Sequence, residues 1–161
     1  MRFPPDYPHR PPKVKLLTTG GGVVRFNPNL YANGMVCISM LGTWKGPSWT
    51  PAQCLITVLT EIQSVMNKEP YDNEPDLEKL GKNSEHRDRY TDFVRHETLR
   101  VAVCQMMENP PVGMPDSLQT EMKKLFLNSF DFYVRVAERN CKLDGKIMLV
   151  VSLCFMTFGV G

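Results

Sequence analysis

The residue with the clearest potential for chemistry is Cys37, which lies in the stretch from Arg25 to Ala52. Two turn signals precede it, the Asn27-Pro28-Asn29 sequence and the Asn33-Gly34 pair. Asn and Gly tolerate positive φ and Pro fixes φ, so both sequences favour tight turns. Two turns would fold the segment back and bring the Asn29 amide near the Cys37 sulfur. An amide donates hydrogen bonds without titrating, which suits an oxyanion that forms at the carbonyl of a thioester.

A structural interpretation of Cys37 stands beside the chemical one. Free cysteines are among the most buried residue types, and Val36 and Ile38 on either side of Cys37 are apolar. The Asn-Pro-Asn sequence alone is only a turn. A cysteine hydrolase that pairs Cys37 with His96 is a third alternative, but a hydrolase needs a base oriented at the thiol, and the sequence near Cys37 supplies none. The residues alone therefore leave a reactive thiol and a core cysteine both open.

Composition limits the other classes of function. The chain has 161 residues, 22% charged residues and a net charge of +2, which fits a single globular domain and gives no reason to expect nucleic acid or a membrane surface as a partner. The five cysteines are widely spaced and include no CxxC pair, so a reducing compartment is expected. The three histidines lie in different elements, and no metal site is expected. The first ten residues lack the apolar core of a signal peptide.

The N-terminal half predicts a proline-rich loop followed by short strands. Residues 4–12 carry five prolines and cannot be helical. Residues 13–18 and 23–26 are expected to be strands on either side of three consecutive glycines. Thr50 is expected to cap a helix that runs to about Asn67 and buries one apolar face, with Gln53 completing a capping box. That face consists of Leu55, Val58, Leu59, Ile62, Val65 and Met66.

The C-terminal half predicts two further helices. Residues 68–83 are polar and broken by proline, which indicates a loop. A helix is expected from Ser84 to about Glu108, with Tyr90, Phe93, Val94, Val101 and Cys104 inward. Asp116 is expected to cap a third helix with an inward stripe formed by Leu118, Met122, Leu125, Phe126, Phe132, Tyr133 and Val136. Residues 147–160 are almost wholly apolar but too short to span a bilayer.

Several motifs in this order resemble the ubiquitin-conjugating enzymes. The family pattern reads Y-P-x-x-P-P-K-V, H-P-N, N-G-x-I-C-L and W-S-P-A. The matching runs here are Tyr7–Val14, Phe26–Asn29, Asn33–Ile38 and Trp49–Ala52. The insert 42–48 and the segment 95–104 resemble a branch of the family with an extra C-terminal portion. The likeness covers about residues 2–144.

The resemblance implies roles for six residues. Cys37 matches the cysteine that holds the modifier as a thioester, and Asn29 matches the asparagine that steadies the loop or the oxyanion. Glu74 falls near an acidic position that guides and deprotonates the incoming lysine. His9, Pro51 and Ala52 match the loop tips that touch RING-type ligases, although His9 replaces a larger apolar residue. Asn27 stands where the family usually has a structural histidine.

The resemblance also implies a fold, partners and a location. The expected fold is α+β, a partial ubiquitin-conjugating domain in which an antiparallel sheet remnant packs with helices. The expected parts are a core at 1–108, a helical extension at 109–144 and an unmatched apolar tail at 145–161. The partners would be ubiquitin or a ubiquitin-like modifier, the activating enzyme and a RING-type ligase, in the cytoplasm and the nucleus. No cofactor is expected, because ATP is used by the upstream activating enzyme.

The match also implies a chain truncated at its N-terminus relative to the family. The family's first helix and first strands have no counterpart here, so an open sheet edge and a half-covered core predict low stability. The expected activity is transfer of the modifier from Cys37 to a lysine. The alternative is an inactive truncated form that acts as an adaptor or has no function.

Overall fold

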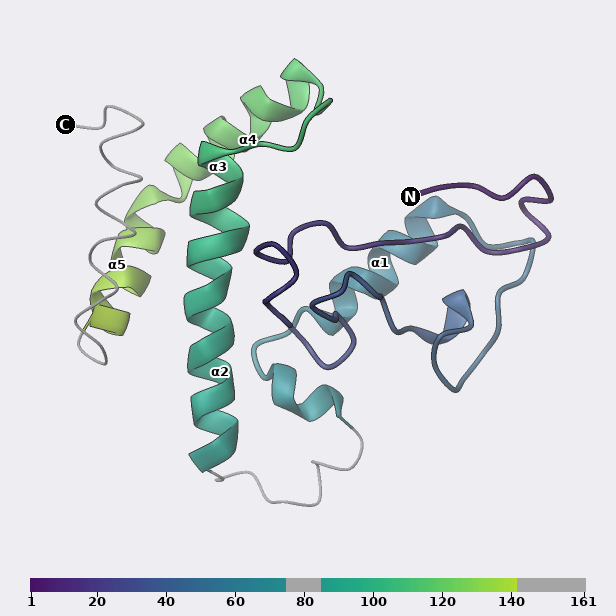
Figure 1. Cartoon of the computed structure of the whole chain (residues 1–161), viewed down its shortest axis with the longest axis horizontal. Helices are drawn as coiled ribbons and strands as arrows, with labels where there is room; N and C mark the ends of the chain where they lie inside the picture. Colours follow the sequence, from purple (N-terminus) through teal and green to yellow (C-terminus); the bar gives the residue numbers. More distant parts are fainter. Residues whose placement is uncertain (75–84, 142–161) are drawn as a thin grey trace. The chain divides into compact units, whose positions relative to one another are not determined.

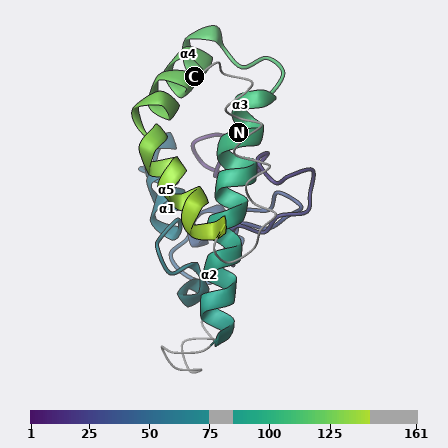
Figure 2. The same cartoon turned by 90° about the vertical axis from the view of Figure 1, so that its left-hand side faces the viewer.

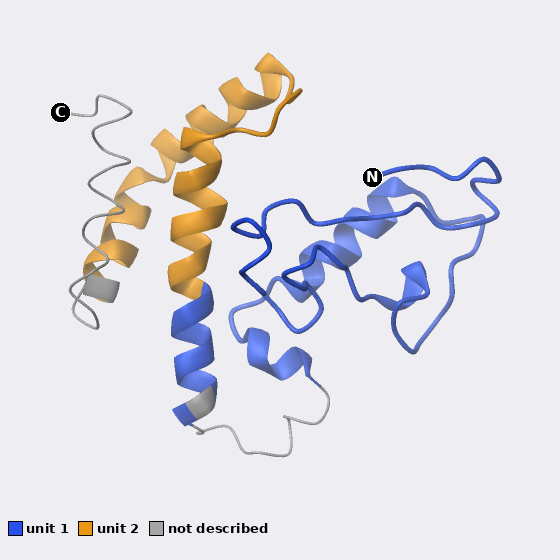
Figure 3. Cartoon of the chain, in the orientation of Figure 1, with its two compact units in different colours: residues 1–94 blue, residues 95–161 orange. Residues whose placement is uncertain are grey.

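The computed structural model describes residues 1–74 and 85–141, except the side chains of His86, Asn140 and Cys141. The chain divides into two compact units, residues 1–94 and residues 95–161 (Figure 3). Figure 1 labels the α-helices of the described residues. In chain order the helical elements are η1 Ser39–Leu41, α1 Leu55–Val65, η2 Pro70–Asn73, α2 Glu85–Glu97, η4 Thr98–Gln105, α3 Met106–Glu108, α4 Asp116–Asn128 and α5 Phe130–Cys141. The expected tail at 145–161 lies outside the described residues.

The two expected strands do not form a sheet in the described part of the chain. Residues 13–18 and 23–26 contribute only an isolated bridge between Arg2 and Lys13. The Leu16 N–H donates to the Gly34 carbonyl at 2.9 Å, but no second pair continues from it into a ladder. A strand needs a neighbour along its length to satisfy its backbone groups, and here residues 13–18 form a single bridge and residues 23–26 form none. The expected sheet remnant is therefore not found.

Helix α1 begins later than the sequence predicts. Its N-cap is Cys54 rather than Thr50, and the Cys54 and Thr57 side chains form a reciprocal capping box. The signal read at Thr50 closes a separate turn, because the Thr50 N–H donates to Gln53 Oε1 at 2.9 Å and the Gln53 N–H donates to the Thr50 carbonyl at 3.0 Å. Thr50 and Cys54 each have a possible capping partner three residues later, Gln53 and Thr57. The chain uses the second for the helix and the first for the turn that leads into it.

The core of the first unit lies between α1 and the segment that carries Cys37. Val58 of α1 is completely buried and packs with the buried residues Leu30, Val36, Ile38 and Met40. Ile62 and Val65 pack against this cluster as expected, whereas Leu55, Leu59 and Met66 are exposed. The apolar stripe of α1 is thus narrower than its sequence predicts. It holds the helix against the residues on both sides of Cys37.

The start of α2 is fixed to η2 within the first unit. Arg87 is largely buried, and its Nη1 donates to Asp72 Oδ2 at 3.0 Å and lies 3.6 Å from Glu69 Oε2. The rings of Tyr71 and Tyr90 meet edge to face with centroids 5.8 Å apart. Acidic residues in the first turn of α2 and basic residues in the last complement the helix dipole.

The described part of the second unit consists of helices, apart from the connection at residues 109–115 and Ser129. The helix expected from Ser84 to about Glu108 is found over residues 85–108, as α2, the π-helical η4 and α3 in succession, and Ser84 itself lies outside the described residues. Figures 1 and 2 show α5 running beside η4, where Leu99, Cys104 and Ala137 form a buried cluster. Val101 and Cys104 point inward as expected, whereas Phe93 is exposed.

The third expected helix is broken into α4 and α5. Ser129 separates the two, and its N–H donates to the Leu125 and Phe126 carbonyls at 3.1 Å. Phe126 is buried and stacks on Tyr133 with ring centroids 5.6 Å apart, whereas Leu118, Leu125 and Phe132 are exposed. Asp116 is the first residue of α4 and makes no side-chain cap. Among the helices described, none combines the length and the apolarity required to cross a bilayer.

Candidate active site

The Asn27-Pro28-Asn29 turn is anchored on the C-terminal end of α1. Asn27 is only 2% exposed, and its Nδ2 donates to the Val65 carbonyl at 2.7 Å. Its Oδ1 accepts the Asn29 N–H at 2.9 Å, which is the local side-chain bond that favours Asn in turns. Asn73 of η2 donates to the same Val65 carbonyl at 2.8 Å. One buried amide therefore fixes the position of Asn29 relative to α1.

Asn29 in turn holds the backbone of Cys37 from both sides. Its main-chain carbonyl accepts the Cys37 N–H at 2.8 Å, and its Nδ2 donates to the Cys37 carbonyl at 2.7 Å. The two turns do bring Asn29 and Cys37 together, but the amide faces the Cys37 backbone and not its sulfur. Asn29 Oδ1 is buried, and no partner for it is found in the described part of the chain.

The Cys37 thiol is closed off from solvent. Cys37 is 4% exposed, and its Sγ donates to the Thr43 carbonyl at 2.8 Å. Burial raises the pKa of the Cys37 thiol and is the largest influence on it. Hydrogen bonding with the Thr43 side chain and the positive charge of Arg25 lower this pKa, whereas the negative charge of Glu74 raises it further. Reactive cysteines are usually partly exposed and lie in electropositive surroundings. The Cys37 thiol is buried, so in this arrangement we expect it to be protonated and unreactive.

Arg25 is a residue of this site that the sequence analysis did not single out. Its guanidinium lies over the Tyr31 ring at 4.1 Å, and its Nη2 donates to the Pro28 carbonyl at 2.6 Å. The same Nη2 is 3.6 Å from Glu74 Oε2, so Glu74 is brought to the site through Arg25. The only signal was its place two residues before Asn27, which is too weak to identify a site residue. Both charges act on the Cys37 pKa, and no histidine of the described residues does.

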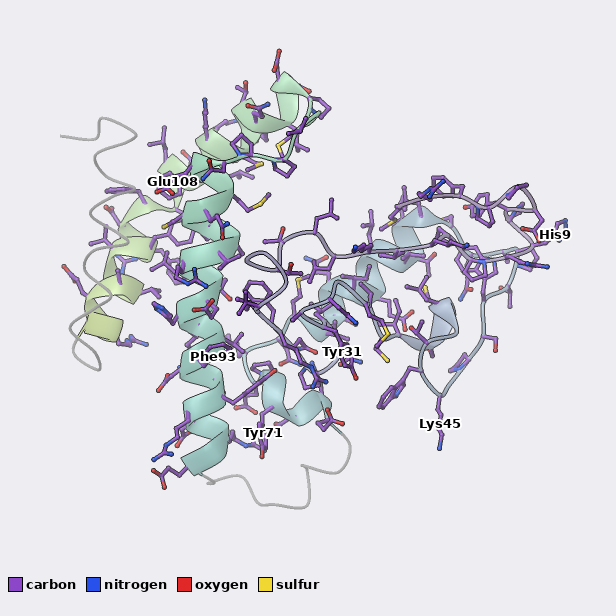
Figure 4. The ribbon with its side chains drawn as sticks, in the orientation of Figure 1. His9, Tyr31, Lys45, Tyr71, Phe93 and Glu108 are labelled. Atoms are coloured by element: carbon purple, nitrogen blue, oxygen red, sulfur yellow. The ribbon has the colours of Figure 1, made fainter. Side chains whose placement is uncertain are left out.

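The three residues matched to ligase contacts lie on two exposed loops that are joined. His9, Pro51 and Ala52 are all exposed. Trp49 Nε1 donates to the Pro8 carbonyl at 2.7 Å, which fastens the loop of His9 to the loop of Pro51. Figure 4 labels His9 at the tip of the first loop, with its side chain pointing outward. Within the described ranges no group of three His, Cys, Asp or Glu side chains is arranged to hold a metal ion.

Comparison with known proteins decides the family. Residues 1–98, well over half of the chain, match the family described as ubiquitin-conjugating enzyme. The chain belongs to this family. It is 51% identical over 148 residues to ubiquitin-conjugating enzyme E2 Z of Xenopus tropicalis and 50% identical over 148 residues to that of Homo sapiens, in each case across 92% of this chain.

The chain matches less than half the length of these E2 Z relatives. The chain spans 47% of the Xenopus protein and 41% of the human one. It is also 41% identical over 116 residues, or 67% of this chain, to the human protein named dual E2 ubiquitin-conjugating enzyme/E3 ubiquitin-protein ligase BIRC6, of which it covers 2%. The family membership supports an α+β ubiquitin-conjugating fold and a transferase.

The pKa values of the two cysteines of the first unit, Cys37 and Cys54, are shifted in opposite directions, so their thiols should ionise at different pH. The backbone N–H of Thr57 at the start of α1 lowers the pKa of Cys54, whereas burial raises that of Cys37. Because the thiolate is the nucleophile, iodoacetamide should alkylate Cys54 with a half-maximal rate at lower pH than Cys37. Peptide mass spectrometry of samples quenched across a pH series measures both rates in one reaction. A Cys37 profile at or below that of Cys54 would contradict the burial seen here.

Proposed function

We propose that this chain carries ubiquitin or a ubiquitin-like modifier as a thioester on Cys37 and transfers it to a lysine. The observation that carries the proposal is the double hydrogen bond between Asn29 and the Cys37 backbone, in a chain that belongs to the ubiquitin-conjugating enzymes. It fixes where the sulfur stands relative to an amide donor. Such a pair suits acyl transfer, in which a nucleophile and an oxyanion donor must share one carbonyl.

Loading exchanges one thioester for another. The Cys37 thiolate attacks the modifier's terminal carbonyl carbon, the bond from that carbon to the cysteine of the activating enzyme breaks, and the departing sulfur takes up a proton from water. The Cys37 proton must first leave to solvent. The guanidinium of Arg25 lowers the pKa of the thiol and therefore favours this loss, against the effect of burial.

Transfer to lysine uses the remaining capacity of Asn29. An amide nitrogen has two N–H groups, and one of them is engaged with the Cys37 carbonyl. The second can donate to the oxyanion that forms when a neutral lysine amine attacks the thioester carbonyl. Glu74 would attract the lysine and accept its proton, after the carboxylate leaves Arg25. The products are an isopeptide bond and the free Cys37 thiol.

The partners of such an enzyme follow from its two transfers. The activating enzyme delivers the modifier and is the protein that uses ATP, so the chain would need no cofactor. The joined loops of His9, Pro51 and Ala52 form the exposed surface proposed for a RING-type ligase, with the cytoplasm and the nucleus as places of action. We further propose residues 1–108 as the conjugating core, 109–144 as a helical extension and 145–161 as an added tail.

A thioester assay tests the function directly. Incubated with activating enzyme, ATP and ubiquitin, the protein should form an adduct on a non-reducing gel that disappears on addition of thiol. Cys37→Ser should form no thiol-sensitive adduct, because an oxygen ester resists exchange with thiol. Cys54→Ser is the matched control and should load like the wild type, because Cys54 is exposed at the start of α1. Folded wild type without an adduct would contradict the proposal.

Asn29→Ala separates loading from transfer. The variant keeps the main-chain bond from Cys37 to residue 29 and loses the amide donor. Loading needs little charge reorganisation, so most thioester formation should remain. Discharge onto free lysine should slow by about 10²–10³, the usual effect of one oxyanion donor. Single-turnover discharge of a preloaded thioester measures this rate.

The control for this variant lies in the neighbouring turn. Asn33 Oδ1 accepts the Met35 N–H at 2.9 Å and is exposed at the surface, so Asn33→Ala changes an asparagine of the same segment without touching Cys37. It should discharge at the wild-type rate. Equal losses of loading and discharge in Asn29→Ala would show that Asn29 only holds the loop, and unchanged discharge would remove its catalytic role.

A further inference from the structure

The segment after Cys37 forms a small loop, residues 39–46, that returns to its own start. We call it the Thr43 loop. It begins with η1 and leaves that turn through Gly42 in the left-handed region, at φ 71°. Gly46, at φ 144°, passes so close to Ser39 that a Cβ atom on it would stand 2.8 Å from Ser39 Cβ. The two ends of the loop therefore meet, and its crown turns back over Cys37.

Thr43, at the crown, bonds to both neighbours of Cys37 and to Cys37 itself. Its Oγ1 accepts the Ile38 N–H at 3.0 Å and is placed to donate to the Val36 carbonyl at 2.8 Å or the Ile38 carbonyl at 3.1 Å. Its main-chain carbonyl accepts the Cys37 thiol. The hydroxyl thus fixes the carbonyl that covers the sulfur.

A single residue, Thr43, separates the Cys37 sulfur from solvent on the side of the Thr43 loop. Val36, Cys37 and Ile38 are each at most 4% exposed, whereas Thr43 is exposed. Thr43 also lines a cleft of about 500 Å³ together with Val36 and Leu41. Solvent lies directly outside Thr43, and the cleft offers room into which its side chain can turn. A rotation of residues 42–46 alone would uncover the sulfur while Met40 and Leu41 stay packed in the core under it.

We infer that Thr43 is a positioning residue that closes the loop over Cys37 and releases the sulfur for reaction. The inference rests on the proposed function in so far as Cys37 is the nucleophile. In the closed form the thiol proton is shared with the Thr43 carbonyl. When that proton leaves to water, the thiolate and the Thr43 carbonyl oxygen repel each other, and burial, the largest influence on the Cys37 pKa, also disfavours a covered thiolate. These two effects oppose the side-chain hydrogen bond of Thr43, which lowers that pKa, so loss of the proton and opening of the loop favour one another. A closed, protonated thiol would be protected until a partner or the solvent takes the proton.

Alkylation of Cys37 by iodoacetamide tests this gate without any enzyme partner. Thr43→Val keeps the shape of the side chain but removes the hydroxyl, so the Ile38 N–H and the Val36 carbonyl lose their hydrogen bonds to residue 43. The loss of a bond to a buried group should favour the open loop and raise the alkylation rate at neutral pH, where the wild-type thiol is mostly protonated and covered, by about 10-fold or more, while the rates converge at high pH. Thr43→Ser restores the hydroxyl and should react like the wild type. Gly46→Ala, which forces the ends of the loop apart, should also speed the reaction.

Three controls separate a gate from a loss of stability. Cys54, exposed on the same unit, should react at one rate in every variant. Thr60→Val exchanges the same residue types at an exposed position of α1 and should leave Cys37 slow. Val58→Ala weakens the core under Cys37 without touching the Thr43 loop, and should also leave Cys37 slow while it lowers the melting temperature.

The outcomes decide the inference either way. Faster alkylation in Thr43→Val and Gly46→Ala, restored by Thr43→Ser, supports the gate. Equal rates in wild type and folded Thr43→Val overturn it, as does an equal acceleration in Val58→Ala or a loss of helical circular dichroism in Thr43→Val. If the gate result holds while no variant and no wild type forms a thioester, the proposed function fails and the gate stands as a property of the thiol.

Discussion

The double hydrogen bond between Asn29 and the Cys37 backbone is the constraint on which the rest of the site depends. Both bonds go to main-chain atoms, so they fix the path of the chain at Cys37 without consuming its side chain. Asn27 transfers that constraint to α1 through the Val65 carbonyl. The end of the helix, the Asn-Pro-Asn turn and the cysteine thereby become one rigid piece, with the Val58 cluster beneath it.

This arrangement separates position from reactivity. Asn29 holds the backbone of Cys37 through hydrogen bonds, and the Thr43 carbonyl covers its sulfur. A thiol that is fixed but protonated and covered is protected from unwanted acylation and oxidation. Arg25 and Glu74, paired beside it, supply charges of opposite sign that act on the thiol pKa in opposite directions. Displacing either charge by a partner would change the ionisation of Cys37 without moving its backbone.

Local signals in the sequence predicted part of this site and tertiary contacts decided the rest. The turn residues at Asn27 and Asn33 sufficed to bring Asn29 to Cys37, because turn geometry depends on a few neighbouring residues. They did not reveal which atoms would meet, since the orientation of an amide depends on the buried bond of Asn27 to α1. The helix starts show the same limit. Thr50 and Cys54 carry similar capping patterns, and only the surrounding contacts select Cys54.

Longer-range features were less accessible. The cover by Thr43 requires the loop to close on itself through Gly46 and Ser39, and nothing in the spacing from Cys37 predicts that return. The alternating segment 13–18 has the composition of a strand, but strand formation depends on a paired neighbour and not on the segment alone. The helix over 85–108 was predictable because its apolar period and its proline stop are local.

Amide hydrogen exchange at Cys37 and Ile38 tests the central claim most directly. The Cys37 N–H is bound by the Asn29 carbonyl and the Ile38 N–H by Thr43 Oγ1. Both should exchange far more slowly than an unstructured chain, and Cys37 should remain protected in Thr43→Val while Ile38 loses protection. Exchange of the Cys37 amide at the unstructured rate in the wild-type protein would show that Asn29 does not hold the cysteine, and would contradict the account.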